Sequence, residues 1–160
     1  MKTKSESAGN RAKLPRLEMI LERAATELGD INPLVLKHYY AKYPEAKERF
    51  VHHGINNVER LENEMVESAL YCLMIFFERP SEIEILLGEM VPHHEFLEIP
   101  LSFFTGLMES VFEVIERTVP PEEEQSREIL RDLKRQLVSA IEQASANDPV
   151  KVLQSASNKK

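Results

Sequence analysis

Two adjacent histidines, His93 and His94, stand shortly before Pro100, which opens a strongly apolar segment. A neutral imidazole is a common metal ligand. No cluster of cysteines or carboxylates accompanies the pair to suggest zinc. An imidazole placed among apolar residues suits a single axial bond to a haem iron. The pattern therefore predicts that one of these two rings is an iron ligand.

Other reactive residue types do not form a recognisable catalytic set. The chain has no Gly-x-Ser-x-Gly elbow, no glycine-rich phosphate loop and no evident pairing of a nucleophile with a base. Cys72 lies on an apolar helical face, which is typical of a buried, inert thiol. His52 and His53 fall in a segment that reads as a loop. We therefore expect a binding protein and not an enzyme.

The size and charge of the chain restrict its partners and its location. Its 160 residues fit one domain with a sizeable core. The net charge of −7 argues against nucleic acid, because phosphate binding needs a basic surface. No apolar run is long enough to span a bilayer, and the polar N-terminus lacks the apolar core of a secretory signal. We expect a cytoplasmic protein with no membrane partner, which its single cysteine also fits.

The spacing of apolar residues predicts an all-α fold of six or seven helices joined by short turns. We expect one domain over residues 14–146, with disordered polar tails at 1–13 and 147–160. A short turn over 44–50 and a loop over 51–57 separate the second helix from the third. The expected helices cover about 15–28, 32–43, 58–77, 81–92, 100–118 and a last segment that begins near 122.

Several residues mark the expected helix ends. Gly29 suits a left-handed cap after the first helix. Ser81 and Glu84 have the spacing of a capping box. Pro92 is expected to end its helix, because proline has no backbone N–H and clashes with the preceding turn. The variable helix lengths favour an irregular helical fold around a pocket over a regular bundle.

Two landmarks in this order resemble the globin family. Residues 36–50, Leu-Lys-His-Tyr-Tyr-Ala-Lys-Tyr-Pro-Glu-Ala-Lys-Glu-Arg-Phe, are similar to the second globin helix, the proline turn and the phenylalanine that wedges against haem. His93, followed by Ile99-Pro100 and Phe103-Phe104, resembles the proximal histidine, the bend and the next helix. The resemblance spans roughly residues 17–144. It implies a globin-like fold around a haem-type pocket.

The resemblance also implies a role for individual residues. Haem b would be the cofactor, with His93 as its iron ligand and His94 as the alternative. On the distal side, counting back from His93 gives Glu64 and Ser68, whereas the apolar face gives Leu61 and Met65. We favour the apolar pair, because a glutamate facing haem must be desolvated or protonated. The residues implied to contact haem are Leu36, Phe50, Leu61, Met65, Ile99, Phe103, Phe104 and Leu107.

The implied function is reversible binding of a diatomic gas, such as oxygen, for storage, scavenging or sensing. An apolar distal side would accept carbon monoxide and give oxygen little help from hydrogen bonds. Pro92 and the lack of a distal histidine or glutamine favour an alternative, a haem-free globin-like module for signalling or interaction. The 100–118 helix and the last helix carry enough large apolar residues to leave a homodimer open.

Overall fold

The described part of the chain is built entirely from helices. The computed structural model describes residues 4–157, apart from the side chains of residues 4–7, 152, 154 and 155. Within these residues there is no strand, which confirms the all-α prediction. The helices are α1 (Lys4–Ala12), α2 (Leu14–Leu28), α3 (Asn32–Lys42), α4 (Ala46–His53), α5 (Val58–Ile75), α6 (Pro80–Phe96), α7 (Leu101–Glu116), α8 (Glu124–Ala146) and α9 (Pro149–Ser157).

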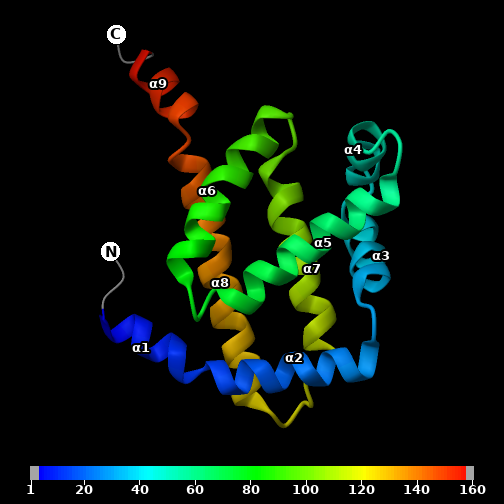
Figure 1. Cartoon of the computed structure of the whole chain (residues 1–160), viewed down its shortest axis with the longest axis vertical. Coiled ribbons are helices and arrows are strands. Elements are labelled where there is room, and N and C mark those ends of the chain that lie inside the picture. The colour runs from blue at the N-terminus through cyan, green and yellow to red at the C-terminus, as the bar shows by residue number, and fades with distance from the viewer. Residues whose placement is uncertain (1–3, 158–160) are drawn as a thin grey trace.

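Helix α7 runs through the centre of the fold. Helices α2, α3, α5, α6 and α8 all pack against it, and α5 crosses in front of it (Figure 1). Along its length only Ser102 and Glu116 are exposed. Its large apolar side chains therefore stabilise this chain's own core, and they offer little surface to a second copy. None of the described helices is long and apolar enough to cross a membrane.

Helix α6 is longer than the sequence predicts, because it continues through Pro92 to Phe96. Proline removes one backbone hydrogen bond and normally kinks or breaks a helix. Here Ile83, Leu87 and Val91 are fully buried and hold α6 against its neighbours, above all α8. Packing of this apolar face compensates for the missing bond. As a result both His93 and His94 lie on the last helical turns of α6, beyond the proline.

Helix α4 replaces most of the expected turn and loop between residues 44 and 57. It begins at Ala46, which is 1% exposed, and ends at His53. Only residues 54–57 connect it to α5, where Asn57 caps the new helix by accepting a hydrogen bond from the backbone N–H of Arg60 at 3.0 Å. Gly54 makes the tight connection, since a Cβ there would lie 2.8 Å from the Phe50 carbonyl oxygen. His52 and His53 are therefore helical and not in a loop.

The expected helix ends at Gly29 and Ser81 have different outcomes. Gly29 ends α2 with a φ of 65°, a value that favours glycine, but its ψ of −128° lies outside the left-handed helical conformation expected of the cap. The capping box at Ser81 does not cap α6, because the helix begins one residue earlier at Pro80 and its cap residue, Arg79, makes no capping bond through its side chain. Proline suits that first position, since it has no N–H to satisfy.

The expected tails differ from the structure over the residues that it describes. Helix α1 occupies most of the N-terminal segment, and α9 extends away from the body at the C-terminal side (Figure 1). Residues 1–3 and 158–160 of the expected tails lie outside the described residues.

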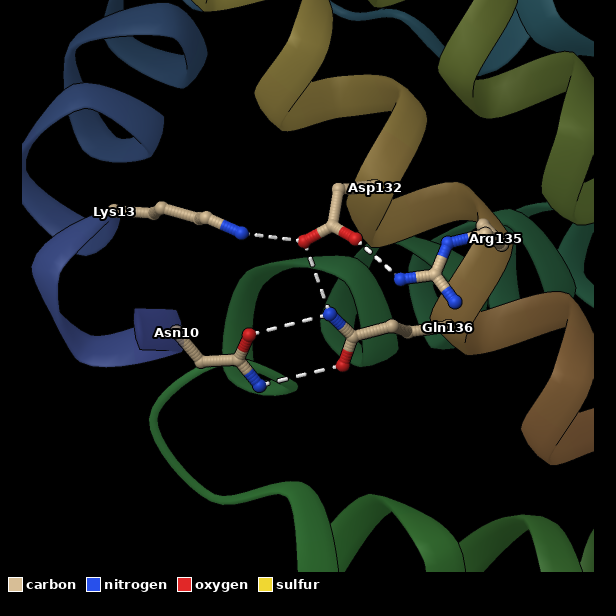
Figure 2. A network of polar contacts seen from close by, with 5 residues as sticks. All are labelled: Asn10, Lys13, Asp132, Arg135 and Gln136. Atoms are coloured by element: carbon tan, nitrogen blue, oxygen red, sulfur yellow. Dashed lines mark hydrogen bonds and ion pairs between the residues drawn. The ribbon is translucent and has the colours of Figure 1, made fainter. Parts of the chain in front are cut away.

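A buried pair of amides anchors α1 to α8. Asn10 is 2% exposed, and its side-chain amide exchanges two hydrogen bonds, of 3.3 and 3.2 Å, with that of Gln136 (Figure 2). Lys13 adds an ion pair of 2.6 Å with Asp132, which also accepts a bond from Arg135. Buried amides that satisfy each other avoid the cost of desolvated polar groups. The segment from Asn10 to Lys13 is thus packed against α8.

Candidate functional site

A mainly apolar cavity of about 200 Å³ lies between α5 and α6, with α3, α4 and α7 completing its walls. The chain folds this way because α5 and α7 each turn an apolar stripe toward the same space. Of the ten haem contacts and iron ligands predicted from sequence, nine line this cavity: Phe50, Leu61, Met65, His93, His94, Ile99, Phe103, Phe104 and Leu107.

His94 is the best-positioned imidazole in the cavity wall. Its Nδ1 lies 2.7 Å from the carbonyl oxygen of Met90, one turn earlier in α6. A carbonyl only accepts hydrogen bonds, so Nδ1 carries the proton and Nε2 keeps its lone pair. Phe104 packs edge-on against the ring, with centroids 5.0 Å apart. The ring is therefore held in one tautomer and one orientation, as metal-ligating histidines usually are.

Burial also keeps His94 in its neutral form. Desolvation lowers its pKa below the ordinary value, and this outweighs the opposing effect of the hydrogen bond to Met90. The nearby rings of His93 and His53 lower the pKa further. At neutral pH the side chain therefore offers an unprotonated nitrogen, which is the form that binds a metal.

His93 and two other basic residues lie at the rim of the cavity. His93 and His53 are both exposed, yet both contribute to the lining together with Arg49. Partial burial, and then the charges of His52, Arg49 and His93, lower the pKa of His53. Because the charge of His93 affects the pKa of His53, the basic groups of α4 and α6 lie close enough to interact. The rim of an otherwise apolar cavity therefore carries an excess of basic nitrogen atoms.

The α5 wall presents the apolar pair that the sequence analysis favoured. Leu61 and Met65 line the cavity, followed by Ser68 one turn on. Glu64, the alternative from counting, is exposed and pairs with Arg60 at 3.0 Å on the outer surface of α5. The described wall from α5 therefore brings no carboxylate to the cavity.

Leu36 is the predicted contact that the structure does not bring to the cavity. It is half-buried and packs against the core, while Tyr39, one turn later on α3, lines the cavity instead. The Tyr39 hydroxyl donates a 2.7 Å hydrogen bond to the carbonyl oxygen of Phe103. The sequence predicts the helix that carries Leu36 and Tyr39 correctly. It does not determine which face of this helix points to the cavity, and residues of one face are three or four apart.

Sequence reasoning missed several other residues of the lining. Met90 precedes His94 by one turn, so helical spacing from His94 was the signal that could have found it. No such spacing relates Arg49 to Phe50, its direct neighbour in the chain. The sequence predicts a loop at His53, and a loop assignment does not place a residue relative to a cavity.

Cys72 lies deep in the same cavity wall. It is 1% exposed, and burial raises the pKa of its thiol to about 11, so the thiolate that reacts with electrophiles is scarce at neutral pH. We expect a thiol reagent to label Cys72 in the native protein at least about a hundredfold more slowly than in urea, since the exposed thiol has a pKa near 8.5. Mass spectrometry of the labelled fraction over time measures this. Comparable rates in both states would show that the wall opens readily.

The described residues contain no cluster of three or more histidine, cysteine, aspartate or glutamate side chains that could hold a metal ion by themselves. A haem iron is different, because the porphyrin supplies four ligands and the protein needs to supply one. Comparisons of the chain with family models, curated proteins and solved structures found no match.

Proposed function

We propose that this chain has a globin-like fold that binds haem b through His94 and takes a diatomic gas at the iron. The observation that carries this proposal is the state of His94 in the cavity wall. Its Nδ1 is satisfied by Met90, its Nε2 is free of a proton, and burial keeps the ring neutral. Of the two histidines, His94 fits the ligand role better than His93, whose ring is exposed at the rim.

The remaining lining fits the chemical character of haem. The apolar side chains of α5, α6 and α7 suit the porphyrin face, with Phe50 and Phe104 available to stack on it. Arg49, His53 and His93 offer partners for the two propionates at the rim. Haem would thus contact apolar walls inside and basic groups at the entrance.

The distal wall favours some gas ligands over others. A bound haem supplies an iron whose sixth position accepts a diatomic ligand. On the α5 side, Leu61 and Met65 offer no hydrogen to such a ligand, and the Ser68 hydroxyl lies one turn further along the helix. The Tyr39 hydroxyl is committed to Phe103, and burial raises its pKa, so it neither ionises nor donates elsewhere without losing that bond. We therefore propose that carbon monoxide or nitric oxide binds more favourably than oxygen, which needs a hydrogen-bond donor.

Titration of the purified protein with hemin tests this function. We expect saturable binding at one equivalent, with a Soret band that sharpens and shifts on reduction and again on addition of carbon monoxide. The reduced protein should oxidise in air without forming a lasting oxygen complex, because Leu61 and Met65, the residues proposed for the distal position, donate no hydrogen bond. A stable oxygen complex would contradict the proposed gas preference while leaving haem binding intact.

One observation favours the alternative of a haem-free signalling or interaction module. The cavity of about 200 Å³ is smaller than the roughly 300–1,000 Å³ of typical ligand pockets, so haem enters only if the walls move apart. If the titration gives only weak, non-saturable association of hemin, the cavity is a feature of the apoprotein and this alternative is favoured. The hemin titration therefore distinguishes the haem-binding function from the haem-free alternative.

The affinity for hemin should depend on pH through His94. Because burial lowers its pKa in the folded protein, the ring is neutral at pH 7 and takes a proton only below the ordinary value of about 6.5. Below its folded pKa, we expect affinity to fall by about tenfold per pH unit, since the proton and the iron compete for Nε2. Hemin titrations at evenly spaced pH values between about 7.5 and 5 measure this dependence of the affinity on pH. A pH dependence in His94→Gln identical to that of the wild type would exclude His94 as the ligand.

Stability should respond to pH in the same direction. The unfolded chain binds the His94 proton at a higher pH than the folded chain does, so the free energy of unfolding falls as pH drops through about 6.5. Above that pH the contribution of His94 is constant. Urea unfolding of wild type and His94→Gln at two pH values isolates the effect.

A further inference from the structure

Glu95, the residue directly after His94, ties the end of α6 to the last two helices. Its side chain is only 15% exposed and forms an ion pair of 2.8 Å with Lys151 of α9. The hydroxyl of Ser145, near the end of α8, donates a hydrogen bond to the same carboxylate. Lys151 also donates to Ser145, at 2.6 Å. The three side chains form a closed triangle, which we call the α6–α9 clamp.

The clamp is electrostatically favourable although it is partly buried. The ion pair with Lys151 and the hydrogen bond from the Ser145 hydroxyl offset the cost of taking the Glu95 carboxylate partly out of water. Ser145 is 6% exposed, so any rearrangement that separates it from Glu95 leaves a buried carboxylate without its partners. The clamp therefore resists a change in the position of the last turn of α6.

Helix α9 depends on few other contacts with the body of the protein. It extends away from the other helices (Figure 1), and the side chains of Val150 and Leu153 are 60% and 69% exposed. Its first turn is capped by Asp148, whose carboxylate accepts a 3.0 Å hydrogen bond from the backbone N–H of Val150. Because these two apolar side chains of α9 bury little surface, the clamp has a large influence on the position of the helix.

We propose that Glu95 is a positioning residue that couples the occupancy of the cavity to the docking of α9. The proposal rests on the proposed haem site, because the coupling acts through the neighbouring His94. Any movement of the imidazole that accompanies bond formation moves the next residue of the same helical turn. The clamp transmits this change to Lys151 and so to α9.

The coupling must act in both directions. If an occupied cavity changes the docking equilibrium of α9 by some factor, docking of α9 changes the affinity of the cavity by the same factor. Helix α9 is then both a reporter of occupancy and a regulator of it.

Hydrogen exchange with and without hemin tests the coupling. In the wild type, we expect saturating hemin to change the exchange rates of the amides of residues 149–157 by about fivefold or more, the lower end of typical allosteric couplings. Lys151→Met should abolish this change and alter the affinity for hemin by the same factor. Lys37→Met is the matched control, since it removes an exposed lysine of α3 for which the structure describes no ion pair, and it should leave both quantities unchanged.

The outcomes separate this inference from the proposed function. If hemin binds and the exchange of α9 is unchanged, the coupling is wrong while haem binding stands. If hemin does not bind, the proposed function is wrong. The clamp is then tested in the apoprotein, where Lys151→Met must speed exchange in residues 93–97 relative to Lys37→Met, and equal rates would overturn it.

Discussion

His94→Ala should remove the Soret spectrum of the hemin-loaded protein and weaken hemin binding by at least about a hundredfold. Loss of outer partners of a metal ligand already costs about 10–100-fold in affinity, and here the ligand itself is removed. The variant should still fold, because the ring is only half-buried and its neighbours Phe104 and Met90 are unaffected. Circular dichroism verifies the fold, and titration followed at the Soret band measures the affinity.

His93→Ala is the matched control, because it removes the adjacent imidazole from the exposed rim. Its affinity for hemin should fall by less than about fivefold, since exposed charge interactions contribute below about 1 kcal/mol. Free imidazole should restore the spectrum of His94→Ala by filling the space of the lost ring. A normal spectrum in His94→Ala together with a lost one in His93→Ala would assign the ligand to His93 instead.

The sequence analysis predicts His93 as the iron ligand with His94 as the alternative, whereas the geometry that supports the proposed site favours His94. Adjacent residues on a helix differ by about 100° in direction, so a choice requires the rotation of the last turn of α6. That rotation depends on Pro92, which the sequence analysis expected to end the helix. In the structure α6 continues, and the burial of Val91 and Leu87 turns His94 toward the cavity and leaves His93 at the rim.

The helices themselves were largely predictable because their apolar residues repeat with clear helical spacing. Leu17, Ile20 and Ala24 on α2, and Ala69, Cys72 and Leu73 on α5, are buried as the periodicity indicates. The same periodicity put Leu61 and Met65 on one face of α5, and both line the cavity. Where a long helix has one apolar face, local spacing is enough to assign its contacts.

Short or polar segments were not predictable for the opposite reason. Helix α1 is polar, and its docking depends on Asn10 and Gln136, two residues far apart in sequence whose amides complement each other. Helix α4 has few apolar residues and carries His53 to the rim of the cavity. Tertiary contacts stabilise both helices, so no local sequence pattern predicts them.

The packing of Gly106 leads to the largest expected effect on stability. It is buried in the middle of α7, and a Cβ at this position would lie 2.4 Å from Cε2 of Tyr43. Gly106→Val should therefore destabilise the protein by about 3 kcal/mol, because overpacking forces neighbouring side chains out of their preferred positions. For a chain of this size the melting temperature should fall by roughly 6–12 °C. Thermal and urea unfolding measure both quantities.

The ring of Tyr43 explains why this effect should reach the cavity. It packs against Tyr39 at 5.6 Å and Phe103 at 5.7 Å, and both of these line the cavity. A displaced Tyr43 moves the Tyr39–Phe103 hydrogen bond with it. Gly106→Val should therefore also weaken hemin binding, even though Gly106 itself does not line the cavity.

A double-mutant cycle separates this clash from the other effects of a larger residue. Gly106→Ala should destabilise the wild type, yet in a Tyr43→Ala background it should stabilise by about 0.5–1 kcal/mol. Alanine is the better helix former by about that amount once the ring is absent. The change of sign is the diagnostic result. If Gly106→Ala has the same effect in both backgrounds, glycine is present here for a reason other than close approach of Tyr43, and the proposed link to the cavity wall fails.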